Sequence, residues 1–140
     1  MNETPFLMYR SEDETVTINA LIKDDTVWLT QKAMAELFDC SVDNISLHLK
    51  KIYNEGELTE ETTIEEFSTV QIEGERRVSR KKRFYNLDAI ISVGYRVNSR
   101  KATQFRIWAT GVLKEYMLKG FAMDDERLKQ GTTAFGKDYF

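Results

Sequence analysis

The sequence predicts an α+β fold with an N-terminal β-hairpin, a helix-turn-helix, a basic β-hairpin wing, and then two or three helices packed on the core, in a winged-helix-like arrangement. Three observations predict it. Apolar residues alternate with polar ones in two parts of the chain and return at helical spacing in others. Side chains suited to cap helices precede each helical segment. Positive charge is concentrated in one segment, residues 76–119.

The bulk composition fits one globular domain. A chain of 140 residues buries roughly two thirds of the surface that it exposes when unfolded, which is enough for a hydrophobic core. We expect a winged helix-turn-helix-like domain with a helical C-terminal part at 1–120. A short helix and a flexible tail at 121–140 then lead to a further C-terminal region. The apolar runs are far shorter than the ~20 residues of a membrane span, so no membrane association is expected.

We expect no secretion signal, because Met1 to Arg10 contains no basic region followed by an apolar stretch. The single cysteine, Cys40, cannot form an internal disulfide. Both features predict a protein of the reducing cytoplasm.

The first predicted element is a β-hairpin. Polar and apolar positions alternate from Val16 to Ile22, and a second apolar segment, Val27 to Leu29, follows a polar Lys-Asp-Asp turn. Thr30 then caps a helix that begins at Gln31 and stops near Asp39. Its apolar face consists of Ala33, Met34, Leu37 and Phe38.

The second predicted helix begins after Ser41, which can cap it, and runs to about Tyr53. Ile45, Leu49 and Ile52 mark its buried stripe, and Gly56 is an end signal. With Gln31 as its first position, this window has the small and apolar residues of a helix-turn-helix at the required offsets, among them Met34, Ala35, Phe38 and Ile45. Asp39 replaces the usual turn glycine, and Leu49 takes over the anchoring role at the position next to His48.

If the second helix lies in a major groove, its N-terminal and outward residues reach base edges. Asn44 suits adenine, Asp43 can accept a hydrogen bond from cytosine, and Lys50 suits phosphate or guanine. The candidates for base readout are Ser41, Asp43, Asn44, Ser46, Leu47 and Lys50. The alternative is an ordinary helical hairpin whose polar face meets only solvent.

A basic hairpin follows an acidic loop at 57–66. We expect strands at 68–72 and 76–86, joined by a Gly-containing turn at 73–75. Because side chains of a strand alternate between faces, one face carries Arg76, Arg80 and Lys82, which we expect to contact DNA phosphates. We expect the opposite set, Arg77, Lys81 and Arg83, to pair with the acidic segment. A solvated charge pattern with an internal partner is the alternative.

The C-terminal part is predicted to be helical. Asn86 caps a helix through Val93, and Ser99 caps a long helix that ends at Gly120. The long helix has one apolar side, with Ala102, Phe105, Ala109, Val112 and Tyr116. A short helix covers 124–130, and the tail after 131 is unstructured.

Further phosphate contacts are predicted at two helix starts, where free backbone N–H groups favour anions. The first set is Gln31 and Lys32, and the second is Ser99, Arg100 and Lys101. Cations oppose the helix dipole in a first turn, which indicates another purpose for Arg100 and Lys101. The alternative is a pair of exposed charges near carboxylates.

The net charge of −3 hides a strong segregation along the chain. Residues 1–75 contain five Lys or Arg against 17 Asp or Glu, residues 76–119 contain 12 against two, and residues 120–140 contain three against four. A polyanion responds to the local field rather than to the net charge, so this distribution permits a basic face beside an acidic one.

Two motifs carry a family resemblance. VWLTQKAMAELF, followed by FYNLDAIISVGYRVNSRKATQFRIWAT, closely resembles the virulence-associated RhuM family of bacterial proteins over roughly Thr26 to Leu128. The portion SRKATQFRIWAT is also similar to Bro-N type DNA-binding domains of phage and viral proteins. The resemblance implies a DNA-associated function, often encoded in mobile or pathogenicity regions.

The sequence contains one near-match to an enzyme motif, and that match is incomplete. Residues 131–137 satisfy the pattern GxxxxGK, but Asp138 replaces the Ser or Thr that would bind Mg²⁺, and no strand is expected before the motif. We expect no catalytic residues, metal site, cofactor or small-molecule substrate. The sequence therefore predicts a module that binds double-stranded DNA, either as a monomer or as a homodimer. The alternative is a protein-interaction module that does not bind DNA directly.

Overall fold

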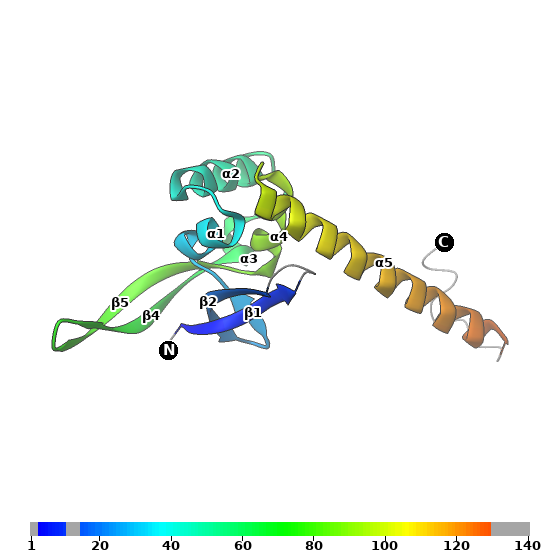
Figure 1. The fold of residues 1–140 in the computed structure, drawn as a ribbon, viewed down its shortest axis with the longest axis horizontal. Coiled ribbons are helices and arrows are strands. Elements are labelled where there is room, and N and C mark those ends of the chain that lie inside the picture. Colours follow the sequence, from blue (N-terminus) through cyan, green and yellow to red (C-terminus); the bar gives the residue numbers. More distant parts are fainter. Residues whose placement is uncertain (1–2, 11–14, 130–140) are drawn as a thin grey trace. The chain divides into compact units, whose positions relative to one another are not determined.

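The computed structural model describes residues 3–10 and 15–129, which form two antiparallel sheets and five helices (Figure 1). The predicted α+β class is confirmed. The elements in chain order are β1 Thr4–Arg10, β2 Thr15–Lys23, β3 Thr26–Trp28, α1 Gln31–Phe38, α2 Val42–Asn54, α3 Glu60–Thr63, β4 Ile64–Glu73, β5 Arg76–Tyr85, α4 Leu87–Arg96 and α5 Arg100–Lys129. The chain divides into two compact units, residues 1–106 and 107–140.

The predicted N-terminal hairpin is confirmed as β2 and β3, with Leu21 opposite Trp28 and Lys23 opposite Thr26. Asp24 and Asp25 make the turn with φ angles of 55° and 58°. Two consecutive residues with positive φ give the tight turn whose twist matches that of the strands. Asp tolerates this backbone conformation better than most residues, because its short side chain can bond locally.

The sequence did not predict β1, which pairs with β2 at the edge of this sheet. Two features hide the strand. Pro5 cannot donate to a ladder and is therefore confined to edge strands, and the pairing register shifts between Leu7 and Tyr9. Such an irregularity breaks the alternation on which strand prediction depends.

The predicted apolar faces of α1 and α2 are buried. Their core-facing residues are Ala33, Met34, Leu37, Phe38, Ile45, Leu49 and Ile52. The ring of Phe38 packs edge-on against that of Phe105, with centroids 5.2 Å apart. A second cluster joins the two sheets and consists of Leu21, Trp28, Phe67 and Phe84.

The predicted loop at 57–66 contains structure instead. A short helix, α3, fills Glu60–Thr63, and β4 begins at Ile64 rather than at Ser68. The buried hydroxyl of Thr63 donates to the Thr59 carbonyl and lies 2.8 Å from the Tyr53 hydroxyl. These contacts fix the acidic segment on α2, which composition alone did not reveal.

Two helices are longer than predicted. α4 continues past Val93 to Arg96, and α5 continues through Gly120 to Lys129 without a separate helix at 124–130. One glycine inside a helix costs only about 1 kcal/mol relative to alanine, and good helix formers flank Gly120. The residues from 130 onward, which include the predicted tail and the GxxxxGK pattern, lie outside the described residues.

The predicted apolar side of α5 is buried only in the first unit. Ala102 and Phe105 are buried, whereas Val112 and Tyr116 are 47% and 71% exposed. The described part of the second unit contains only this helix, so nothing in that unit covers them. None of the helices among the described residues is long and apolar enough to cross a membrane.

Candidate nucleic-acid interface

α1 and α2 are joined by a tight, well-capped turn. The Thr30 hydroxyl accepts a hydrogen bond from the Ala33 N–H at 3.1 Å, and the Ser41 hydroxyl accepts one from the Asn44 N–H at 3.0 Å. Between the helices, Asp39 adopts the left-handed conformation with φ 52° and ψ 57°. The Cys40 N–H then donates to the Ala35 carbonyl at 3.0 Å. The predicted caps are confirmed, and Asp39 takes the place of the usual turn glycine in a left-handed conformation.

α2 exposes a polar face opposite its buried stripe. Of the six residues predicted to read bases, Ser46 is half-buried and the others are exposed: Ser41, Asp43, Asn44, Leu47 and Lys50. Within the described residues, the side chains of Asp43, Asn44, Leu47 and Lys50 form no hydrogen bond or ion pair. This face is therefore free to bind a partner, and the backbone of its first turn is fixed by Ser41.

His48 lies at the border between the two sides of α2 and is half-buried. Burial lowers the pKa of its imidazole below the ordinary value, and the nearby charges of Lys51 and Arg96 lower it further. Leu49, beside it, is buried, as the predicted anchoring role requires. His48 therefore favours its neutral form.

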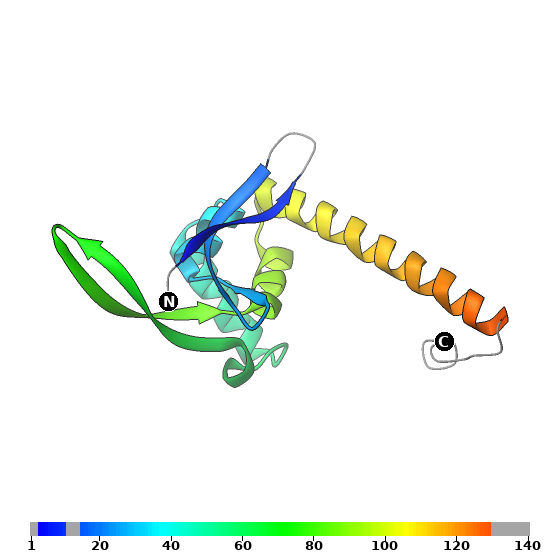
Figure 2. The same ribbon diagram turned by 90° about the horizontal axis from the view of Figure 1, so that it is seen from below.

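The β4–β5 hairpin extends away from the rest of the first unit as a twisted two-stranded ribbon (Figures 1 and 2). Its register is unbroken from Ile64 opposite Tyr85 to Glu73 opposite Arg76. Side chains therefore alternate strictly between two faces. We call these the Tyr85 face, with Arg77, Lys81 and Arg83, and the Phe84 face, with Arg76, Arg80 and Lys82.

The ion pairs of β5 lie on the Phe84 face. Lys82 pairs with Glu3 at 2.8 Å, and Arg80 pairs with Glu73 at 2.9 Å. We predicted pairing for the opposite set, and this was wrong: within the described residues, Arg77, Lys81 and Arg83 form no ion pair. Glu3 directly precedes β1, a strand that the sequence did not predict, so its contact with Lys82 was not foreseen.

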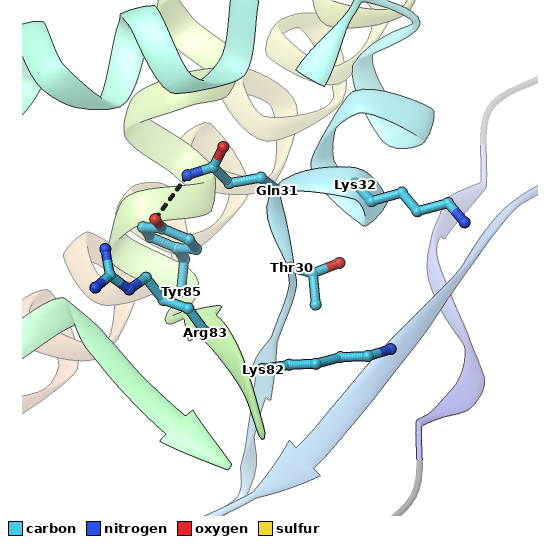
Figure 3. A pocket seen from close by; sticks show the side chains of 6 residues that line it. All are labelled: Thr30, Gln31, Lys32, Lys82, Arg83 and Tyr85. Carbon is cyan, nitrogen blue, oxygen red and sulfur yellow. Dashed lines mark hydrogen bonds between the residues drawn. The ribbon is translucent and has the colours of Figure 1, made fainter. Parts of the chain in front are cut away.

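A pocket of about 350 Å³ lies where β5 meets the start of α1. Its lining residues come from these two elements and are Thr30, Gln31, Lys32, Lys82, Arg83 and Tyr85. Figure 3 shows the Gln31 amide pointing to the Tyr85 hydroxyl, to which it donates at 2.8 Å. Three of the six lining residues are cations, and although Lys82 is paired with Glu3, Lys32 and Arg83 give the pocket positive charge for an anion. The predicted phosphate ligands Gln31, Lys32 and Lys82 are thereby brought together.

The third predicted phosphate set lies at the start of α5. The Ser99 hydroxyl accepts from the Ala102 N–H at 3.0 Å and donates to the Phe38 carbonyl, at the end of α1. It therefore caps α5 and ties it to the α1–α2 turn. Arg100 is exposed and Lys101 half-buried, and neither forms an ion pair with a described residue.

Two features of this region were not predicted from the sequence. Arg83 and Tyr85 line the pocket, although we expected Arg83 to pair with the acidic segment and predicted no role for Tyr85. Arg96 of α4 pairs with both Glu55 and Glu57 after α2. Because these partners are about 40 residues from Arg96, only the fold brings them together. No cluster of metal-ligating side chains occurs among the described residues.

Comparison with known proteins gives one family. The model of the Virulence protein RhuM family matches residues 62–140, which is more than half of the chain. The match includes the hairpin, α4 and α5 but not α1 or α2. A search of curated proteins and a search of solved structures each gave no match. The local similarity to Bro-N type domains stays a prediction.

Proposed function

We propose that this chain, which belongs to the virulence protein RhuM family, binds double-stranded DNA as a winged helix-turn-helix-like module. The observation that carries the proposal is the unbonded polar face of α2, together with a hairpin strand that has six Lys or Arg at 76–83. A helix of this size fits the major groove, where its exposed side chains can read base edges. The cationic hairpin of the same unit neutralises phosphates.

Each element of the module contributes either specificity or affinity. α2 supplies specificity, with Asn44 as the residue best suited to a bidentate contact with adenine. β5, the start of α1 and the start of α5 supply affinity for the backbone, which carries no sequence information. Residues 31–106 thus bind DNA without performing chemistry on it. A DNA partner in a bacterial protein also implies a cytoplasmic location and a role such as transcription regulation.

A second candidate function is a protein-interaction module. It is favoured by apolar side chains that lie exposed on α5, namely Ile107, Val112, Leu113, Tyr116, Met117 and Leu118. Exposed apolar patches mark interaction sites. This reading predicts association with a protein, including a second copy of the chain, and no dependence on DNA.

Fluorescence anisotropy with a random-sequence duplex separates the two functions. If the module neutralises about six phosphates, affinity should fall roughly 10³-fold between ~50 and ~200 mM salt. Absence of salt-sensitive binding at micromolar protein would instead favour the protein-interaction module. Light scattering at the same protein concentrations reports any self-association.

A further inference from the structure

We propose that the Tyr85 face of the hairpin, with Arg77, Lys81 and Arg83, is the surface that follows the phosphate backbone of duplex DNA. The inference rests on the proposed DNA-binding function and names the side of the hairpin that meets the DNA. It reverses the expectation from sequence, which selected Arg76, Arg80 and Lys82 on the Phe84 face.

The two faces have different neighbours where the hairpin joins the first unit. Phe84 packs with Leu21, Trp28 and Phe67, so the Phe84 face is turned toward the β1–β3 sheet. The Tyr85 hydroxyl accepts a hydrogen bond from Gln31, the first residue of α1. Figure 1 shows α1 and α2 on one side of the base of the hairpin and β1 and β2 on the other. The Tyr85 face therefore begins on the side of α2, the helix proposed to enter the groove.

The two faces also differ in the state of their charges. Arg80 and Lys82 already have carboxylate partners on this chain, Glu73 and Glu3. A phosphate would have to displace those partners or bind beside them. The three cations of the Tyr85 face have no ion-pair partner within the described residues. Glu66 lies opposite Arg83 in the register without forming an ion pair with it. None of the three cations has to leave a bound carboxylate of a described residue before it contacts a phosphate backbone, which rewards each new neutralising contact by releasing counterions.

The Tyr85 face is continuous with the pocket at the start of α1. Figure 3 shows Arg83 and Tyr85 on the same side as the Gln31 amide, whereas the Lys82 side chain extends away from them. From Arg83, the face continues through Lys81 to Arg77, a span of roughly 20 Å at the ~3.3 Å per residue of a strand. One DNA strand presents a phosphate every ~3.4 Å along the helix axis, so several phosphates lie within reach of this track.

The exposed apolar side chains of β4 lie on the same face. Val70 and Ile72 are opposite Ser79 and Arg77, and Ile72 is 76% exposed. Proteins that contact the minor groove place apolar side chains among cations in this way. The outer end of the Tyr85 face thus offers both charge for phosphates and an apolar surface for a groove.

Two matched triple variants of the full chain test the inference. The first replaces Arg77, Lys81 and Arg83 by Gln, and the second replaces Arg76, Arg80 and Lys82 by Gln. Both remove the same charge from the same strand. For three lost contacts, the first should reduce the slope of log K against log salt by about 2.7, and the second by no more than about 0.9.

Circular dichroism verifies that both variants fold, and the single variants Lys81→Gln and Arg80→Gln repeat the comparison with less perturbation. Equal slopes for the two sets, or a larger loss for the Phe84 face, would overturn the inference while the salt-dependent binding of the unmodified chain still upheld the proposed function. If the unmodified chain shows no salt-dependent binding to duplex DNA, both proposals fail together.

Discussion

His48 is the residue whose charge is most sensitive to pH near neutrality. Its pKa is lowered from the ordinary 6.5 by burial and by the charges of Lys51 and Arg96. The unfolded chain therefore takes up this proton at a higher pH than the folded chain does. The stability that this residue contributes is complete above the unfolded pKa and is lost as the pH falls below it.

A denaturant titration between about pH 5.5 and 8 tests this effect, because histidine is the side chain that ordinarily titrates in that range. The free energy of unfolding of the unmodified chain should decline as the pH falls below 6.5. His48→Gln should reduce that decline. Identical pH dependence in the two proteins would show that His48 protonates equally well in both states.

Position 94 has no room for a side chain larger than that of glycine. A Cβ at this position of α4 would lie 2.5 and 2.7 Å from two ring carbons of Phe105, and 3.0 Å from the Phe38 ring. Both rings are buried and cannot turn away, so Gly94→Ala should cost about 1 to 3 kcal/mol. Gly111→Ala in α5 is the matched control, because nothing lies within 4 Å of its new Cβ. That control should keep or raise stability, and a thermal melt that ranks the two variants in the opposite order would contradict the packing argument.

At the scale of elements, the α1–α2 turn depends on the left-handed backbone conformation of residue 39. A non-glycine residue in the left-handed conformation costs roughly 1 to 2 kcal/mol, and Asp39 has φ 52°. Asp39→Gly should therefore maintain or increase stability, and Asp39→Val should decrease it. Glu36→Gly, at an exposed position inside α1, is the control and should cost about 1 kcal/mol. If both glycine variants lose equal stability in urea unfolding, Asp39 is not strained.

Local chemistry made the element boundaries predictable where a cap was present. Thr30, Ser41, Asn86 and Ser99 were each predicted to cap a helix, and each accepts a hydrogen bond from an N–H three residues later. Two elements with neither a side-chain cap nor a clear alternation, β1 and α3, were missed. The proline and register shift of β1 hide its pattern, and α3 is defined by burial of Thr63 rather than by any periodicity.

The candidate site was predictable to the extent that it depends on periodicity. Helical spacing separated Ile45, Leu49 and Ile52 from the polar face of α2, and their burial follows that pattern. Strand alternation likewise divided the cations of β5 into two sets. Which set is free to bind phosphates depends on the contact between Glu3 and Lys82. These residues are 79 positions apart in the sequence, so only the folded structure reveals their contact.

At the scale of the whole molecule, the segregated charges are only partly paired. Acidic residues of the first 75 positions neutralise Lys82, Arg80 and Arg96. The remaining cations of β5 and of the start of α5 have no such partner within the described residues. A chain with a net charge of −3 can thus keep a cationic surface, which is what a polyanion requires.

The central claim is that α2 reads sequence while the cationic elements hold the backbone. Selection of bound duplexes from a random pool tests it most directly, with the full chain and with a variant that replaces Asn44, Ser46 and Lys50 by Ala. The account predicts that the unmodified chain enriches a short motif, and that the variant loses the motif but retains most of its salt-dependent binding. If the unmodified chain enriches no motif, or the variant enriches the same one, α2 does not read bases and the central claim is wrong.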